Sequence, residues 1–342
     1  MSAHFASDLG VAASKPATTG PMRILVTGAS GAVGSLLAPR LLIGGHSVRA
    51  FGRDARRIEE ALSDHLLEAE AEEIEVVQGD VVEGEGLERA LRGIDVAYYL
   101  MHSMERTARE ASEFTVRELL AAENFAGAAA GAGVSRIVYL GGLAPRSQPE
   151  EQTRASRHLA SREAVERILL DAVPDSVALR ASIVIGERSR SFRFLVRLVE
   201  RMPVLTLPAW RRFRTQPIDA RDITEMLAAC SAVEFPRRSL DVGGPDVLTY
   251  GEMIAEIAEL LLVNRPSVRL GVSATPFAGR LAAAIAGEDP ALVLPLMEGL
   301  QGDLLAADDG AAELLGVRLH SFRAAVEHAL GDWEESERLR AR

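Results

Sequence analysis

Three glycines near the start of the chain are spaced to hold a phosphate group. They belong to the segment Thr27-Gly28-Ala29-Ser30-Gly31-Ala32-Val33-Gly34, which follows the apolar run Arg23-Ile24-Leu25-Val26. In this TGxxGxxG spacing the first glycine can take a positive φ, the second lets the main chain approach an anion, and the third lets a helix pack closely on a strand. A helix beginning near Ala32 would point its N-terminal N–H groups at that anion. The segment predicts a pyrophosphate site between a strand and a helix, in preference to a merely tight turn.

A cation follows the second apolar run, where an NAD site usually carries an acid for the ribose 2′-OH. The run ends Arg49-Ala50-Phe51-Gly52-Arg53. The planar guanidinium of Arg53 suits a 2′-phosphate, so the sequence favours NADP(H) over NAD(H). The alternative is a solvated arginine at the start of a charged helix, with Asp54 as its N-cap. After the third run, Asp80 in Gly79-Asp80-Val81 is a candidate partner of an adenine amino group or a helix cap.

These residues need a parallel sheet to position them. From Met22 the chain alternates short β-branched runs with longer helical patterns, which is typical of βαβ units. We expect strands at 23–26, 48–51, 74–77, 94–100, 136–140 and 177–179. The predicted fold class is α/β, a Rossmann-type doubly wound parallel sheet with a smaller, mainly helical C-terminal substrate lobe. The expected division is a disordered tail at 1–21, a dinucleotide-binding domain at 22–185 to which 215–245 returns, and a substrate-binding lobe from 186–214 and 246–335.

Composition narrows the function classes. The 342 residues are 48% hydrophobic and 25% charged, which is typical of a globular protein. The formal net charge of −11 should repel phosphate backbones, so nucleic acid is not an expected partner. The one cysteine, Cys230, forms no intramolecular disulfide and suits the reducing cytoplasm. The seven histidines show no metal-site spacing, so no metal is expected.

Targeting and membrane signals are not expected. The opening stretch has no basic region followed by an apolar one, so it does not read as a signal peptide. The most apolar later run, 282–296, contains two acids and two prolines and falls short of the ~20 residues that span a bilayer. We therefore expect no membrane span and a small-molecule substrate as the partner. A homo-oligomer is compatible with the sequence.

The chain resembles the atypical, or extended, short-chain dehydrogenases/reductases, in particular the bacterial NAD(P)H-binding proteins akin to NmrA. The resemblance covers about 22–262 and, besides the glycine loop and Asp80, rests on Tyr98-Tyr99-Leu100-Met101-His102-Ser103, Leu140-Gly141-Gly142-Leu143, His158-Leu159-Ala160-Ser161-Arg162, Gln216-Pro217-Ile218, Arg221-Asp222 and Gly243-Gly244-Pro245. It implies that NAD(P)H lies across the strand ends. The residues expected to contact it are Thr27, Gly28, Ser30, Gly31, Ala32, Val33, Gly34, Arg53, Asp80, Val81, Leu100, Met101, Leu140, Gly141, Gly142 and Arg162.

The chain departs from the active members of that family at the catalytic pair. Those members use a YxxxK pair on the helix after the fifth strand, with a serine at that strand's end. Here the aligned positions hold His158 and Arg162, the serine position falls in Gly141-Gly142, and Lys15 is the only lysine. Arg162, with a pKa above ~12, cannot relay a proton but could hold the nicotinamide ribose. His158, with an unperturbed pKa near ~6.5, could donate a proton to a substrate oxygen, or could be a partly exposed helix histidine.

Further candidate groups lie elsewhere in the chain. His102 is the second candidate proton donor, with Ser103 and Tyr99 beside it, although Tyr99 ends an apolar run and suits the core. The cluster Trp210-Arg211-Arg212-Phe213-Arg214 could clasp an anionic or conjugated substrate, or could form a solvated loop or a subunit contact.

Two functions follow from this pattern. The first is an NADP(H)-dependent oxidoreductase of a hydrophobic small molecule, with the hydride from the nicotinamide and the proton from a donor other than tyrosine. The second is an NADP(H)-binding sensor or scaffold without turnover, which the missing YxxxK pair favours. The enzyme is preferred because a histidine and an arginine occupy the vacated positions, where degeneration would more often leave inert residues. An isomerase or epimerase that uses bound cofactor is a third possibility in the extended family.

Overall fold

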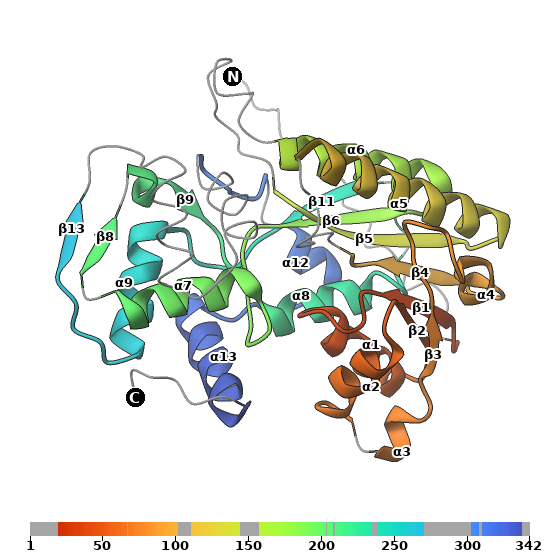
Figure 1. The fold of residues 1–342 in the computed structure, drawn as a ribbon, viewed down its shortest axis with the longest axis horizontal. Helices are drawn as coiled ribbons and strands as arrows, with labels where there is room; N and C mark the ends of the chain where they lie inside the picture. The colour runs from red at the N-terminus through yellow and green to blue at the C-terminus, as the bar shows by residue number, and fades with distance from the viewer. Residues whose placement is uncertain are drawn as a thin grey trace, which may run out of the picture.

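A computed structural model of the chain describes residues 20–66, 68–101, 111–143, 157–202, 204–207, 209–233, 235, 238–269, 302–307 and 310–336 (Figure 1). The expected tail therefore lies almost entirely outside the described residues, as does the apolar run 282–296. No helix in the described ranges is long and apolar enough to cross a membrane.

A seven-stranded parallel sheet forms the centre of the molecule. Its strands run in the order β11-β6-β5-β4-β1-β2-β3, so the chain reverses direction across the sheet between β1 and β4. This order confirms the doubly wound Rossmann-type fold. The strands are β1 (Arg23–Thr27), β2 (Ser47–Gly52), β3 (Glu75–Gln78), β4 (Val96–Tyr99), β5 (Arg136–Gly142), β6 (Val177–Ala181) and β11 (Arg238–Val242).

Helices cover both faces of the sheet, which explains why its strands read as nearly continuous apolar runs. Along β1, Ile24 and Val26 face one core with α1 and α8, while Leu25 faces the other with α5 and α6 (Figure 1). The helices of this domain are α1 (Gly34–Ile43), α2 (Ala55–Ser63), α3 (Glu68–Ala71), α4 (Leu87–Leu91), α5 (Ala111–Gly131), α6 (Arg157–Ala172) and α8 (Ala220–Ala229).

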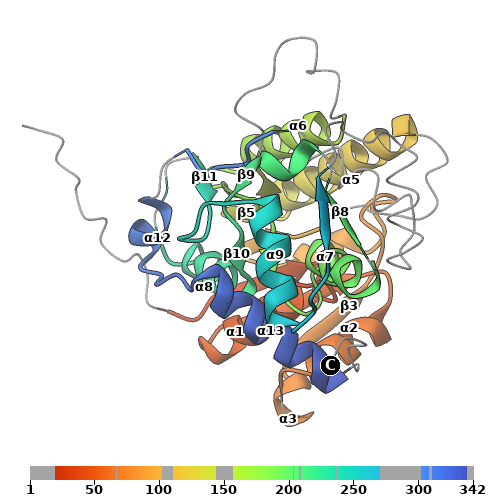
Figure 2. The same cartoon turned by 90° about the vertical axis from the view of Figure 1, so that its left-hand side faces the viewer.

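A second lobe beside the sheet has its own apolar core, in which Phe192, Tyr250, Ile254 and Trp333 are buried (Figure 2). The helix α12 (Gly310–Leu315), which the expected division places in this lobe, packs differently, because its Ala311 belongs to the core that contains β1 and α1. The elements after β6 are β7 (Val184–Ile185), α7 (Arg190–Arg201), β8 (Leu205–Leu207), the 3-10 helix η1 (Ala209–Arg212), β9 (Arg214–Thr215), β10 (Ile218–Asp219), β12 (Leu248–Thr249), α9 (Tyr250–Leu260), β13 (Ser267–Arg269), α12 (Gly310–Leu315) and α13 (Phe322–Ser336).

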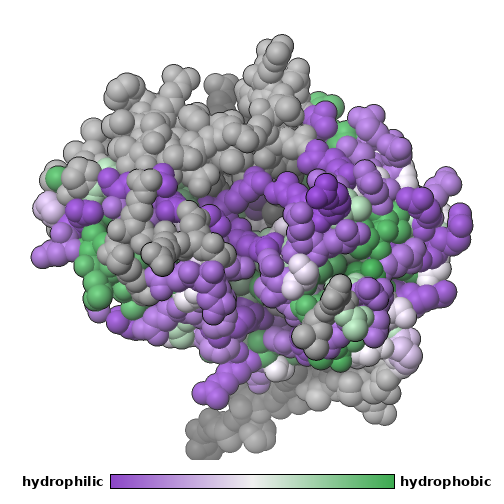
Figure 3. Space-filling view, turned by 60° about the horizontal axis from the view of Figure 1, so that its bottom comes forward, coloured by the Kyte–Doolittle hydropathy of each residue, from purple (hydrophilic) through white to green (hydrophobic). Residues whose placement is uncertain are grey.

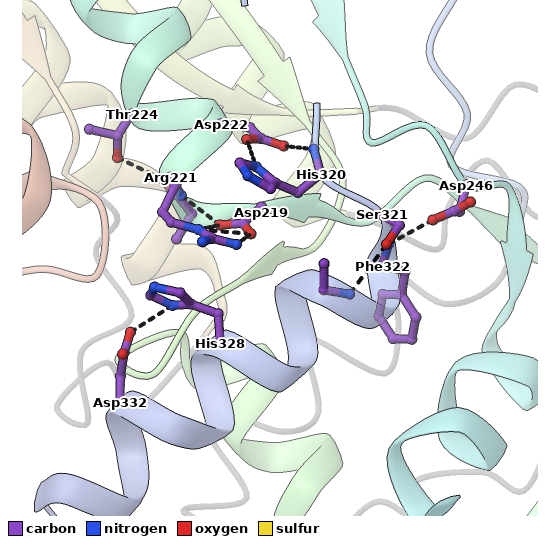
Figure 4. A network of polar contacts seen from close by, with 12 residues as sticks. Asp219, Arg221, Asp222, Thr224, Asp246, His320, Ser321, Phe322, His328 and Asp332 are labelled. Carbon is purple, nitrogen blue, oxygen red and sulfur yellow. Dashed lines mark hydrogen bonds and ion pairs between the residues drawn. The ribbon is translucent and has the colours of Figure 1, made fainter. Parts of the chain in front are cut away.

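Two carboxylates from earlier in the chain, the buried Asp222 and the half-buried Asp246, hold the segment at the start of α13 (Figure 4). Asp222 of α8 accepts a hydrogen bond from the main-chain N–H of His320 at 2.7 Å, and the His320 Nδ1 lies 2.6 Å from its other oxygen. Burial raises the pKa of Asp222, and the two His320 contacts oppose that rise. Asp246 accepts the N–H of Phe322 at 2.6 Å. The start of α13 is therefore held by two carboxylates that lie far earlier in the sequence.

The face of the molecule seen in Figure 3 is mainly polar. Hydrophilic side chains run across its middle, and apolar ones form smaller patches to either side. An ion pair between Arg188, just after β7, and Asp64, at the end of α2, also connects the second lobe to the domain that contains the sheet. The two parts of the molecule are thus joined by charged contacts as well as by apolar packing.

A leucine ends α9 in a conformation that favours glycine. Leu262 has φ 55° and is 85% exposed, and its N–H and that of Val263 bond to Glu259 and Ala258 in a Schellman motif. We expect Leu262→Gly to raise the free energy of unfolding by about 1 kcal/mol, because it relieves the left-handed strain and loses little packing. Urea denaturation measures this change.

Gly316 provides the matched control, because it ends α12 with the same hydrogen-bond pattern and φ 67°. Gly316→Ala should lower the free energy of unfolding by about 1 kcal/mol. A Leu262→Gly protein that is less stable than the wild type would show that the Leu262 side chain makes stabilising contacts.

Candidate functional site

The three loop glycines have different structural roles. Gly28 has φ 69°, and a Cβ there would lie 2.9 Å from the main-chain oxygen of Leu100, so this glycine lets the loop meet the end of β4. A Cβ on Gly34 would lie 2.2 Å from the Gly28 oxygen, a severe backbone clash. Gly31 is exposed and has more room, since its Cβ would meet only the Gly28 oxygen, at 3.1 Å. The first and third glycines are therefore needed for the fold of the loop, and the second leaves its outer surface open.

Helix α1 offers its N-terminus at this loop. It begins at Gly34, two residues later than expected from the sequence, because Ala32 and Val33 continue the turn. Its N-cap, Val33, makes no side-chain capping hydrogen bond, and its first turn contains no acidic residue. The positive end of the helix dipole is therefore left for an external anion, which is what a pyrophosphate requires.

Thr27 and Leu100 hold the loop at the carboxyl edge of the sheet. The Thr27 hydroxyl donates to the main-chain oxygen of Tyr98 at 2.9 Å and accepts from the N–H of Leu100 at 3.3 Å. The Thr27 side chain is fully buried, so its role is to connect β1 to β4 rather than to face a cofactor. Leu100 and Met101 are half-buried beside it.

The end of β2 presents a basic surface. Arg53 is exposed, and Asp54 behind it accepts from the N–H of Arg57, which confirms Asp54 as the N-cap of α2. The other arginine of this strand, Arg49, instead pairs with Glu75 at 2.6 Å and donates to main-chain oxygens at the end of α4. Arg53 is therefore the exposed arginine of this strand end, whereas Arg49 is held against the edge of the sheet.

The residues after β3 form a tight turn. The Asp80 carboxylate accepts the N–H of Val82 at 2.7 Å, so it stabilises this turn and caps no helix. Val81 is fully buried, and the Asn124 side chain donates to the main-chain oxygens of Val81 and Val82. The structure places Asp80 at the same sheet edge as the glycine loop, with part of its hydrogen-bonding capacity already used.

At the end of β5, Arg162 fills the space left by glycines. A Cβ on Gly142 would lie 2.4 Å from the Arg162 Nη1, so glycine there lets α6 bring the guanidinium against the strand end. The Arg162 Nε is buried and has no hydrogen-bond partner in the described part of the chain. Leu140 and Gly141 are buried beside it. Helix α6 contains neither tyrosine nor lysine. An unpartnered donor here fits a bound cofactor that supplies oxygen acceptors, such as the hydroxyls of a ribose.

A buried acid that the sequence analysis missed lies behind Arg162. Glu118 of α5 accepts a hydrogen bond of 2.6 Å from the Ser161 hydroxyl. Burial raises the pKa of Glu118, whereas Ser161 and the charge of Arg162 lower it. An acid within the Ala-rich helical pattern was the only available signal, and Ser161 lies 43 residues further along the chain.

One of the remaining candidate proton donors lies in the apolar core, and the side chains of the others lie outside the described residues. Tyr99 is 3% exposed, with ring centroids 5.0 Å from Phe125 and 6.1 Å from Tyr139, and burial raises the pKa of its phenol. This supports its interpretation as a core residue rather than a donor. His158 belongs to α6 four residues before Arg162, but its side chain lies outside the described residues, as do His102 and Ser103 entirely.

The aromatic and basic cluster of the second lobe is partly internal. Trp210 is buried, and the Nε and Nη2 of Arg214 donate to the same oxygen of Asp303, at 3.0 and 2.8 Å. Arg212 lies over the ring of Phe213, 5.5 Å from its centroid. The charge of Arg214 is thus neutralised by an acid, and Arg212 lies on an aromatic ring.

Comparisons of sequence identify relatives. Residues 28–182 match the NAD(P)H-binding family model. The chain is 28% identical over 257 residues to the (4-alkanoyl-5-oxo-2,5-dihydrofuran-3-yl)methyl phosphate reductase of Streptomyces griseus, which covers 73% of this chain and 78% of the reductase. It is also 34% identical over 128 residues to a 3 beta-hydroxysteroid dehydrogenase/Delta 5-->4-isomerase of Mycobacterium tuberculosis, but that match spans only 36% of this chain and 32% of the relative.

Comparisons of structure support the fold along nearly the whole chain. The UDP-glucuronic acid 4-epimerase of Bacillus cereus, solved with UDP-glucuronic acid and NAD, superposes with a TM-score of 0.68 at 16% identity over 92% of this chain and 100% of the epimerase. The epimerase Mth375 of Methanothermobacter thermautotrophicus gives a TM-score of 0.68 at 19% identity over 92% and 93%. These similarities extend the shared fold through the second lobe.

Proposed function

Because residues 28–182 match the NAD(P)H-binding family model and a relative named as a reductase covers 73% of the chain, we propose that the protein is an atypical short-chain dehydrogenase/reductase and an NADP(H)-dependent reductase of a hydrophobic small molecule. The observation that carries this proposal is the glycine loop, which meets an uncapped helix N-terminus at the carboxyl edge of the sheet. The Streptomyces relative, named as a reductase, supports the reaction class. The lone cysteine, Cys230, is buried and unpaired, which suits a cytoplasmic enzyme.

The proposed roles follow from the position of each group. When bound, the cofactor supplies the hydride, and the main chain of the glycine loop and the start of α1 hold its pyrophosphate. Arg162 donates hydrogen bonds to the ribose from its place against Gly142, and its fixed charge lies near the strand end without taking part in proton transfer. His158, one helical turn before Arg162, donates a proton to the substrate oxygen.

The preference for NADP(H) is tested by titrating NADPH and NADH. We expect NADPH to bind about tenfold to a hundredfold more tightly, since a charge-assisted contact of Arg53 with the 2′-phosphate contributes roughly 1.5–3 kcal/mol. Arg53→Ala should bring the affinity for NADPH close to that for NADH and leave NADH binding unchanged. Isothermal calorimetry with both cofactors measures the difference.

Arg56→Ala is the matched control, because Arg56 is an exposed arginine in the first turn of α2. It should reduce NADPH binding much less than Arg53→Ala. Equal affinities for NADPH and NADH in the wild type would contradict the proposed specificity.

The second candidate function is an NADP(H)-responsive sensor or scaffold of the NmrA-like kind. One observation favours it, namely that α6 lacks both members of the YxxxK pair. NADPH oxidation in the presence of a panel of hydrophobic aldehydes, ketones and conjugated carbonyl compounds separates the two functions. Turnover supports the reductase. Failure of every compound, with different affinities for NADPH and NADP⁺ and a change in binding to another protein, supports the sensor.

A further inference from the structure

A buried carboxylate lies behind the arginine at the end of β5. Glu118 of α5 is 7% exposed, and its Oε2 accepts a hydrogen bond of 2.6 Å from the hydroxyl of Ser161. Ser161 directly precedes Arg162 in α6. Burial raises the pKa of Glu118, while the Ser161 hydrogen bond and the charge of Arg162 lower it. The fold therefore holds an acid close to the guanidinium that is proposed to meet the nicotinamide ribose.

Aromatic side chains lie beside this acid. Tyr99 and Tyr139 are almost fully buried, with ring centroids 6.1 Å apart, and a Cβ on Gly141 would lie 2.9 Å from the Tyr139 Cε1. Burial raises the pKa of both phenols, and the charge of Glu118 raises it further, whereas Arg162 lowers the pKa of Tyr139. Buried surroundings of this kind screen charge poorly, so the charge of Glu118 acts beyond its immediate neighbours.

A second buried acid near Arg162 is already neutralised. Glu166, one helical turn further along α6, accepts from the Nε and Nη2 of Arg180 at 2.8 and 2.7 Å. The hydroxyl of Ser239 also donates to it. Glu118 receives a neutral hydroxyl in place of a guanidinium fork, so its charge remains to act on Arg162 and on whatever Arg162 binds.

The charge at this place matters because the two oxidation states of a nicotinamide differ in charge. The oxidised ring is a cation and the reduced ring is neutral, so a nearby cation disfavours NADP⁺ and a nearby anion favours it. Arg162 places a permanent cation at the strand end where the nicotinamide ribose is proposed to lie. The carboxylate of Glu118 has the opposite charge and offsets that effect.

We propose that Glu118 is a positioning residue that acts through Arg162 and sets the balance between bound NADP⁺ and bound NADPH. Its carboxylate offsets the charge of Arg162, so the site tolerates the positive charge that remains on the cofactor when the hydride and its two electrons pass to the substrate. The hydrogen bond from Ser161 holds the carboxylate in place. This inference rests on the proposed reductase function, because that function puts the nicotinamide beside Arg162.

Calorimetric titration of Glu118→Gln with NADP⁺ and with NADPH tests the proposal. Glutamine keeps the shape of the side chain and still accepts the hydrogen bond of Ser161, but it removes the charge. We expect the ratio of the NADP⁺ Kd to the NADPH Kd to rise about threefold to thirtyfold above the wild-type ratio. That change raises the midpoint potential of the bound cofactor by roughly 15–45 mV, and weaker binding of NADP⁺ should account for most of it.

Two further variants separate charge from structure. Glu118→Asp keeps the charge and shortens the side chain, so it should lower the melting temperature by weakening the bond to Ser161 but leave the ratio of the two Kd values close to that of the wild type. Glu123→Gln is the matched control, because Glu123 is an exposed acid of the same helix. Water and salt screen its charge, so its loss should change the ratio by less than about twofold.

An unchanged ratio in Glu118→Gln would overturn this role, as would an equal fall in both affinities, which would make Glu118 purely structural. A shift as large in Glu123→Gln would assign the effect to net charge rather than to Glu118. Failure of the proposed function looks different. A wild type that binds both cofactors and shows the Glu118→Gln shift, but oxidises NADPH with no compound of the panel, contradicts the reductase and leaves the role of Glu118 in cofactor binding standing.

Discussion

A Gly31→Val variant is expected to melt near the wild-type temperature but to gain no stability from NADPH. Gly31 is exposed, and the added Cβ needs only a small shift from the Gly28 oxygen 3.1 Å away. The branched side chain would, however, occupy the path of the pyrophosphate along the loop. At a concentration of NADPH about 100 times its Kd, the wild type should gain roughly 2.7 kcal/mol, and the variant close to none. Thermal melting with and without NADPH measures both quantities.

Gly34→Val is the informative partner of this variant. Its Cβ would lie 2.2 Å from the Gly28 oxygen and 2.8 Å from its carbonyl carbon, and backbone atoms cannot swing aside as a side chain can. This variant should lose stability even without cofactor. A Gly31→Val protein that NADPH stabilises as much as the wild type would contradict the assigned loop, as would a Gly34→Val protein of normal stability.

The second large effect is expected at His158. If this histidine protonates the developing alkoxide, His158→Phe should lower turnover by about 10²- to 10⁴-fold and leave NADPH affinity nearly unchanged. In the wild type the rate of reduction should fall as the pH rises through the pKa of His158 in the complex, because only the protonated imidazole is a donor. Stopped-flow measurement of NADPH oxidation with a substrate found in the panel gives both results.

A substitution of Arg162, in the same helix, should affect cofactor binding rather than proton transfer. Arg162→Ala should weaken NADPH binding, since it removes the donors assigned to the ribose and leaves a gap against Gly142. Wild-type turnover by His158→Phe would move the proton donor elsewhere, with His102 and Ser103 the next groups to replace. A fall in NADPH affinity as large in His158→Phe as in Arg162→Ala would assign His158 to binding rather than to proton transfer.

The sequence was sufficient to predict the loop and every strand of the sheet except β11, because these features depend on local patterns. Strands such as β1 are buried on both faces, so their apolar runs are visible without knowledge of their neighbours. The spacing of Gly28 and Gly34 was enough to predict their roles, because the positive φ of Gly28 and the close helix contact of Gly34 both require glycine. The start of α1 was placed two residues early because no capping side chain marks it.

The contacts around Arg162 could not be predicted in the same way. Gly142 and Arg162 lie 20 positions apart, and only the packing of α6 on β5 shows that the two meet. Glu118 meets Ser161 across two helices, and nothing in the Ala-rich pattern of α5 distinguishes a buried acid from an exposed one. The same limit applies to α12, because its six residues do not indicate which of the two apolar cores they cover.

The contact between Asp222 and His320 has a consequence for the order of events during synthesis. The two residues are 98 positions apart, and at roughly 5–20 residues per second a ribosome takes about 5–20 s to add them. During that interval the Asp222 carboxylate has no imidazole to meet, so it stays hydrated and opposes the burial of α8 on the sheet. We therefore expect α8 to complete its packing on the sheet only after the segment that carries His320 has been synthesised.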